Sequence, residues 1–214
     1  MRDVMIDLET MANSHDSTII QFGGAWFDRH TGEIGKKTEF NVELQGEMEA
    51  GFQVNASTIT WWMGQSQEAQ KSVMSQDNMV DSITAVTMMN EFLRGSSAIW
   101  CHATFDMPIV SNHLATYPVI PSFGYWSCRD LRTLVDLAEI KVDKSKQTGV
   151  AHSALADCLF QIEYTVEAFQ KIEGWKKAGK EADTKCPVCQ GRGYSIAPDD
   201  VADKCEYCHG SGTK

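Results

Sequence analysis

The sequence lacks any long hydrophobic run. No stretch approaches the roughly 18 consecutive apolar residues that a membrane-spanning helix needs. Charges interrupt the opening segment MRDVMIDLET almost at once, which is unlike a signal peptide or a transit peptide. We therefore expect a cytoplasmic protein that has no membrane partner.

The sequence also lacks an excess of basic residues. It has 19 Lys and Arg against 29 Asp and Glu, and its net charge is −10. A passive nucleic-acid binder normally presents a basic face, so this balance argues against non-specific binding. It does not argue against an enzyme whose clustered carboxylates hold divalent cations, because bound cations reverse the local sign of the charge.

The chain also lacks the even number of cysteines that a complete set of disulfides needs, because it has 7. An odd count with CxxC spacing argues against a disulfide framework and for metal binding in a reducing compartment. The 214 residues, of which 43% are hydrophobic, suit one domain with a sizeable core and a small appendage.

Hydrophobic periodicity predicts a mixed α/β domain, because three strands come first and helices then alternate with further strands. The predicted strands are 4–8, 18–27, 38–44, 97–101 and 125–128. The predicted helices are 57–74, a helix capped by Asp77 and ended by Gly95, 106–117, 129–139 and 153–172. Two polar segments predict a mobile loop at 141–149 and a linker at 174–184.

Asp7 and Glu9 are two residues apart at the end of the first strand and point to the same face. Two acids beside an apolar run repel each other unless a cation lies between them. Carboxylates favour Mg²⁺ or Mn²⁺ over Zn²⁺. Taken alone, the pair is also compatible with a surface acid pair at a strand end.

Further acids follow the fourth strand and begin the last long helix. Asp106 opens a helix, where simple capping is the alternative to catalysis. His152 and Asp157 are about 140° apart around a helix, so they converge only if His152 lies in the preceding loop.

Together, these residues resemble the motifs of the DEDDh exonucleases of the RNase H-like superfamily. VMIDLET at 4–10 resembles the first motif, WCHATFD at 100–106 the second, and HSALAD at 152–157 the third. Within the family, TITWWMGQSQ at 58–67 and RDLRT at 129–133 resemble RNase T-like exoribonucleases of mycobacteria and phage exonuclease A. The resemblance implies an RNase H-like mixed sheet flanked by helices over residues 1–173.

The resemblance also implies a chemistry. Asp7, Glu9, Asp106 and Asp157 would hold two Mg²⁺ or Mn²⁺ ions about 4 Å apart, and His152 would act as general base. The reaction would be 3′→5′ exonucleolytic hydrolysis of single-stranded DNA or RNA to nucleoside 5′-monophosphates. RNase T-like relatives are commonly homodimers, so a homodimer is a further expectation.

The candidate substrate-binding residues are Thr10, Trp62 and Phe105. The resemblance implies that the Thr10 backbone approaches the terminal nucleotide of the substrate. One of the adjacent Trp61 and Trp62 is expected to be buried and the other, which we take as Trp62, to stack on a base. For Phe105, core packing is the favoured alternative. His102 stands where many relatives have Asn, which affects how the site is buttressed.

The tail repeats the pattern CxxCxGxG, with Cys186 and Cys189 in one copy and Cys205 and Cys208 in the other. Paired CxxC motifs predict one structural, tetrahedral Zn²⁺ in a small module at 185–214. The pattern resembles the cysteine-rich module of DnaJ-type chaperones. A competing hypothesis is therefore an adaptor or chaperone-like protein, in which this module binds a protein partner and the nuclease fold is inert.

Overall fold

The computed structural model describes residues 2–188, 190, 192, 194–196, 202–204, 206–209, 211 and 213. The chain divides into two compact units, Met1–Phe169 and Gln170–Lys214. None of the described helices is long and apolar enough to cross a membrane.

A six-stranded mixed sheet forms the first unit, in the order β4-β3-β2-β1-β5-β6. β1, β2 and β3 pair antiparallel, as the predicted succession of three strands requires, and the other pairings are parallel. The strands are β1 (Asp3–Thr10), β2 (Ile19–Phe27), β3 (Ile34–Val42), β4 (Met79–Val80), β5 (Ala98–Cys101) and β6 (Cys128–Asp130).

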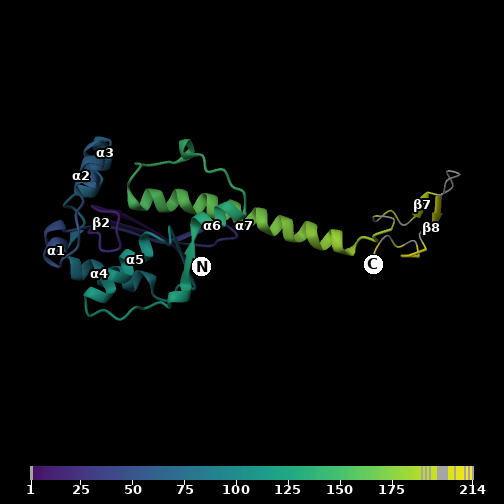
Figure 1. Ribbon diagram of the computed structural model, residues 1–214, viewed down its shortest axis with the longest axis horizontal. Coiled ribbons are helices and arrows are strands. Elements are labelled where there is room, and N and C mark those ends of the chain that lie inside the picture. The colour runs from purple at the N-terminus through teal and green to yellow at the C-terminus, as the bar shows by residue number, and fades with distance from the viewer. Residues whose placement is uncertain are drawn as a thin grey trace. The chain divides into compact units, whose positions relative to one another are not determined.

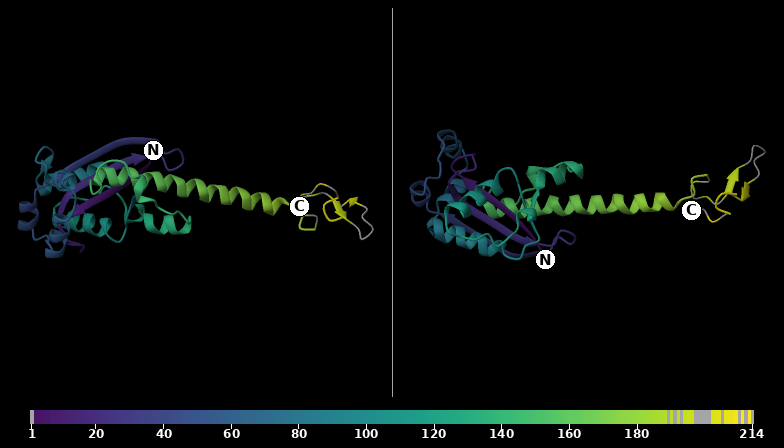
Figure 2. Two further views of the ribbon diagram at one scale, coloured as in Figure 1. Left: turned by 90° about the horizontal axis from the view of Figure 1, so that it is seen from above. Right: turned by 60° about the horizontal axis from the view of Figure 1, so that its bottom comes forward.

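Helices cover both faces of this sheet, which confirms the predicted α/β class. They are α1 (Leu44–Glu49), α2 (Ala56–Met63), α3 (Gln67–Met74), α4 (Ser82–Leu93), α5 (Asp106–Thr116), α6 (Leu131–Leu137) and α7 (Ala154–Thr184). Two short 3-10 turns are η1 (Tyr125–Ser127) and η2 (Lys144–Lys146). Within the first unit, α4 and α5 lie on one face and the beginning of α7 lies on the other (Figures 1 and 2).

The alternation of side chains along β1 assigns the two faces. Val4, Ile6 and Leu8 belong to the main core with residues of α4 and α5. Successive side chains of a strand point to opposite faces, so Asp7 and Glu9 face the side of α7. A fully buried central strand thus carries two acids into the interior, where their charge needs a partner.

Some predicted elements differ from the observed ones. The helix predicted at 57–74 is two helices, because Gly64 ends α2 and the Ser66 side chain caps α3. Asp77 is not a helix cap: Asp81 accepts from the Thr84 amide and begins α4, after β4 has paired with β3. The strand predicted at 125–128 begins only at Cys128.

The segment 174–184, predicted as a linker, is the last part of α7. Its Lys, Glu and Ala residues have high helix propensity, which does not require an apolar face. In the second unit, β7 (Tyr194–Ile196) and β8 (Ala202–Lys204) pair antiparallel.

Candidate active site

The acids of β1 are buried at the centre of the sheet. Asp7 is 8% exposed and Glu9 is 7% exposed, opposite Gly23 and Gln21 of β2. Asp7 accepts a hydrogen bond of 2.7 Å from the Gln161 side chain of α7. The strand therefore presents both carboxylates to the first turns of α7.

Asp106 enters the same site from the beginning of α5. It is 1% exposed, and the backbone N–H of His102 donates to its Oδ2 at 2.9 Å. The Leu8 backbone of β1 also acts on this carboxylate and lowers its pKa, against the larger opposing effect of burial. The residue at 102 thus buttresses Asp106 through its backbone, which a histidine supplies as well as an asparagine does.

His152 lies in the loop immediately before α7, with a left-handed backbone at φ 62°. His152 and Asp157 are therefore not held about 140° apart around one helix, because only Asp157 lies on α7 and His152 can turn toward it. Ligand atoms of Glu9, His152 and Asp157 all lie within 4.8 Å of one another. Residues far apart in sequence therefore converge at the C-terminal end of β1.

Side chains of β2 and β3 fix the beginning of α7. The backbone N–H of Ala154 donates to Gln21 Oε1 at 2.8 Å, and the N–H of Leu155 donates to Glu39 Oε1 at 3.0 Å. The Ser153 hydroxyl also donates to Glu39 Oε1, at 2.8 Å. These bonds satisfy amide groups that a helix N-terminus leaves without intrahelical partners. Neither Gln21 nor Glu39 belongs to a recognisable sequence motif, so their role is visible only in the folded structure.

Gly23 lets α7 approach the sheet this closely. A Cβ at Gly23 would lie 2.2 Å from the backbone carbon of Ala154, whereas a Cβ at Gly24 would meet the Phe92 ring at 2.6 Å. We expect Gly23→Ala and Gly24→Ala each to cost about 1–3 kcal/mol of stability through overpacking.

Only Gly23→Ala should also lower the turnover of the folded protein, because it displaces His152 and Asp157. Chemical denaturation and nuclease assays on both variants measure the two effects separately. Equal turnover in the two variants would contradict this role of Gly23.

The site carries a large excess of like charge. Burial, followed by repulsion from Asp106, Glu9 and Asp157, raises the pKa of Asp7 well above its usual value. Burial and the neighbouring acids raise the pKa of Glu9 to about 8, and burial raises that of Asp106 to about 7. The pKa of Asp157 is also raised, chiefly by burial.

The donor set of this cluster fits a hard divalent cation. The ion pairs between described residues include none that joins Asp7, Glu9, Asp106 or Asp157 to a lysine or arginine. Buried carboxylates without a cationic side chain are stabilised by a bound cation, and oxygen ligands suit Mg²⁺ or Mn²⁺.

These raised pKa values predict an unusual pH dependence of stability. Between about pH 4 and pH 8, the folded site retains protons that the unfolded chain releases, so the metal-free protein loses stability as the pH rises. We expect its melting temperature to fall by at least about 5 °C over this range, since each pKa unit is worth about 1.4 kcal/mol. Differential scanning fluorimetry in EDTA measures this, and added Mn²⁺ should reverse the fall at high pH.

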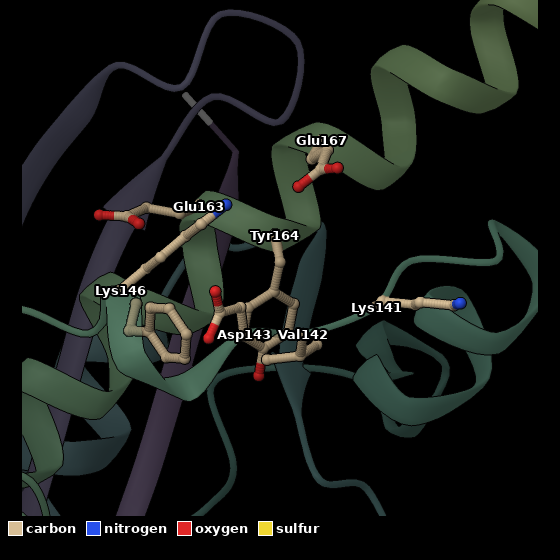
Figure 3. A pocket seen from close by; sticks show the side chains of 8 residues that line it. Lys141, Val142, Asp143, Lys146, Glu163, Tyr164 and Glu167 are labelled. Atoms are coloured by element: carbon tan, nitrogen blue, oxygen red, sulfur yellow. The ribbon is translucent and has the colours of Figure 1, made fainter.

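The lysine-rich segment 141–149 lies against α7 and reaches the site. The Gln147 side chain donates a hydrogen bond to Asp157 Oδ1. A pocket of about 200 Å³ is lined by Lys141, Val142 and Lys146 of this segment and by Phe160 and Tyr164 of α7. Figure 3 shows Tyr164 reaching from the helix toward Val142 and Asp143 of the loop. This segment therefore carries several lysines, and the side-chain amide of Gln147 contacts Asp157 of the site.

The prediction that Trp62 is the exposed tryptophan is wrong, because Trp62 is buried and Trp61 is exposed. Trp62 is 4% exposed, and its indole N–H donates to the Thr10 carbonyl at 2.9 Å, so its ring is not available for stacking. Trp61 is 45% exposed, and its ring centroid lies 4.8 Å from that of His152. Trp61 therefore replaces Trp62 as the candidate platform for a base.

The other two candidate substrate-binding residues lie beside the site. Thr10 is buried, and its hydroxyl donates to the Ala12 carbonyl at 2.6 Å, so its side chain is already engaged. Phe105 is partly buried against the main core, next to Asp106. The proposed substrate contact of Thr10 concerns its backbone and stays a prediction.

The predicted zinc ligands are only partly described. Cys186 and Cys208 are both buried and form one cluster, although they belong to different CxxC pairs. Cys189 and Cys205 lie outside the described residues. The four-cysteine site stays a prediction.

Known proteins resemble this chain along most of its length. A family model described as the 3′-5′ exoribonuclease Rv2179c-like domain matches residues 2–169. An exodeoxyribonuclease of Enterobacteria phage T4 is 26% identical over 222 residues, covering 86% of this chain and 96% of that protein.

Solved structures show the same fold. E. coli exonuclease I in complex with a dT13 oligonucleotide matches with a TM-score of 0.58 at 14% identity, over 82% of this chain and 42% of that one. An exonuclease I from Methylocaldum szegediense matches with a TM-score of 0.57 at 14% identity, over 84% and 43%. This chain therefore spans less than half the length of those structures, and the likeness concerns the fold.

Proposed function

Because the chain belongs to the Rv2179c-like 3′-5′ exoribonuclease domain family, we propose that it removes nucleotides from the 3′ end of single-stranded nucleic acid. The family confirms the exonuclease class predicted from the three motifs. The product of the proposed reaction is a nucleoside 5′-monophosphate. The observation that carries the proposal is the convergence of Glu9, His152 and Asp157, with ligand atoms within 4.8 Å, beside buried Asp7 and Asp106.

The acids supply the binding part of the mechanism. Asp7, Glu9, Asp106 and Asp157 would hold two Mg²⁺ or Mn²⁺ ions, which when bound lower the pKa of a water and stabilise a departing oxygen. Asp7 is central, because its pKa is raised by all three other acids at once. The buried backbone contacts to Asp106 hold that carboxylate in place when the substrate arrives.

His152 supplies the proton transfer. A ring nitrogen of His152 takes a proton from the attacking water, whose oxygen bonds to the phosphorus of the terminal nucleotide. The bond from that phosphorus to the 3′ oxygen of the preceding nucleotide breaks. The ligand atoms of His152 and Asp157 lie within 4.8 Å of each other, so His152 stands beside the acids that would hold the cations.

A single strand fits this site better than a duplex. The acids are buried at 8% exposure or less on β1 and α5, so only a narrow terminal nucleotide reaches them. Trp61 beside His152 offers the aromatic face on which an unpaired base stacks. The E. coli exonuclease I structures hold single-stranded oligonucleotides, which supports the same substrate class here.

The test is a degradation assay on matched DNA and RNA oligonucleotides that carry a 5′ label. With Mg²⁺ or Mn²⁺, the full-length protein should yield a ladder that shortens from the 3′ end. The ratio of the two rates decides the sugar preference, which the family description and the phage relative's name leave open. Internal cuts, or no cleavage of either strand, would refute the proposal.

We also propose that Cys186, Cys189, Cys205 and Cys208 hold one structural Zn²⁺. The burial of Cys186 together with Cys208 supports this, because the two CxxC pairs must meet to form a tetrahedral site. Elemental analysis should find one zinc per chain in the purified protein and less in Cys208→Ser. Zinc content unchanged by that substitution would contradict the assignment.

The adaptor hypothesis is disfavoured by the intact geometry of the nuclease site. A fold that served only as a scaffold would gain stability by losing the buried acids, since burial and mutual repulsion disfavour their charged forms.

A further inference from the structure

Gln161 is a buried amide whose contacts connect α7 to the central acid of the site. It lies one helical turn after Asp157, so both side chains are on the same face of α7. Gln161 is 5% exposed, and its Nε2 donates to Asp7 Oδ1 at 2.7 Å. The same helix therefore carries one acid of the site and orients another.

The second half of the Gln161 amide has no hydrogen-bond partner among the described residues. Its Oε1 is buried and accepts no hydrogen bond from the described residues. The orientation of the amide is fixed when a bound cation keeps Asp7 ionised, because an ionised carboxylate only accepts hydrogen bonds and must face the NH₂ group. Buried acceptors are nearly always hydrogen-bonded, so this oxygen favours a donor from outside the described residues, such as a water.

We propose that Gln161 is a positioning residue of the cation site. Its Nε2 holds Asp7 Oδ1, which leaves the other carboxylate oxygen for the cation. Its Oε1 accepts a hydrogen bond from a water bound to that cation, since Mg²⁺ and Mn²⁺ keep water ligands in protein sites. This inference rests on the proposed function, because it assumes that the acids hold divalent cations.

The nearby Thr165 provides a matched control. It is fully buried one turn further along α7, and its hydroxyl donates only to the Gln161 carbonyl, within the helix. Gln161→Met keeps most of the side-chain volume but removes both polar atoms, and Thr165→Val likewise replaces a buried polar group with an apolar one. Gln161→Ala is a second variant that cannot introduce a clash.

The experiment is calorimetric titration of the full-length protein with MnCl₂ in the absence of nucleic acid. Mn²⁺ prefers carboxylates to thiolates, so the cysteines of the tail contribute little heat. We expect Gln161→Met and Gln161→Ala to bind Mn²⁺ about 10- to 100-fold more weakly than wild type, the usual effect of losing a residue that orients a ligand. Thr165→Val should bind Mn²⁺ as wild type does. At saturating Mn²⁺, kcat should fall and KM for the oligonucleotide should stay unchanged.

The outcomes separate this inference from the proposed function. Wild-type Mn²⁺ affinity in both Gln161 variants would overturn it, as would an equal loss in Thr165→Val. A lower melting temperature in EDTA with unchanged Mn²⁺ affinity would assign Gln161 a purely structural role and overturn it too. If wild type degrades no oligonucleotide but Gln161→Met still weakens Mn²⁺ binding, the nuclease proposal fails and the role of Gln161 stands.

Discussion

Asp7→Asn is expected to abolish nearly all nuclease activity while leaving the protein folded. Asp7 is buried, the charges of the other three acids raise its pKa, and an amide in its place binds a divalent cation far more weakly. Loss of the cations removes several kcal/mol of transition-state stabilisation, a fall in kcat/KM of about 10³-fold or more. Single-turnover cleavage of a labelled oligonucleotide and Mn²⁺ titration measure the two losses.

Thermal stability distinguishes this result from misfolding. Asp7→Asn removes a carboxyl group whose ionised form is disfavoured by burial and by the neighbouring acids, so the melting temperature in EDTA should equal or exceed that of wild type at neutral pH. Asp3→Asn is the matched control on β1, because Asp3 is equally buried but pairs with Arg29 and accepts from the Trp100 indole. It should lower the melting temperature and keep kcat. Substantial nuclease activity in Asp7→Asn would remove the acids from the mechanism.

His152→Ala is expected to lower kcat by about 10²- to 10⁴-fold, the usual contribution of a general base. Mn²⁺ affinity should be retained, because the four carboxylates remain. Mn²⁺ affinity distinguishes a general base from a metal ligand, since a ring nitrogen of His152 lies within 4.8 Å of the ligand atoms of Glu9 and Asp157. Calorimetry and the pH–rate profile, which should lose its acidic limb in the variant, are the measurements.

His30→Ala serves as the control for His152→Ala, because His30 is an exposed histidine between β2 and β3. Its kcat should match that of wild type. A large loss of Mn²⁺ affinity in His152→Ala would make His152 a metal ligand and would assign proton transfer to another group.

The sequence predicts those parts of the fold that local pattern decides. β1 is recognisable because an apolar run surrounds one acid, and the order of strands and helices predicts the α/β class. Local rules cannot choose between Asp77 and Asp81, since both are good helix caps. The choice depends on β4, whose Val80 pairs with Val42 of β3.

The residues that orient the acids carry no motif of their own. Gln21, Glu39 and Gln161 are single polar residues in otherwise ordinary elements, and their partners lie more than a hundred positions away in the chain. The available signals are indirect: a glutamine inside an apolar strand, and a glutamine four residues after Asp157. Trp61 and Trp62 are adjacent, so only packing decides which ring is buried.

Because the pKa of Glu9 is raised to about 8 and that of Asp106 to about 7, the proposed cation binding would release protons at neutral pH. Titrating the protein with Mn²⁺ therefore acidifies a weakly buffered solution, and the measured enthalpy includes the ionisation heat of the buffer. Titrations in two buffers of different ionisation heat give the number of protons expelled. If the acids bind Mg²⁺ or Mn²⁺ as proposed, a change of pH and a change of free cation concentration would shift the same binding equilibrium.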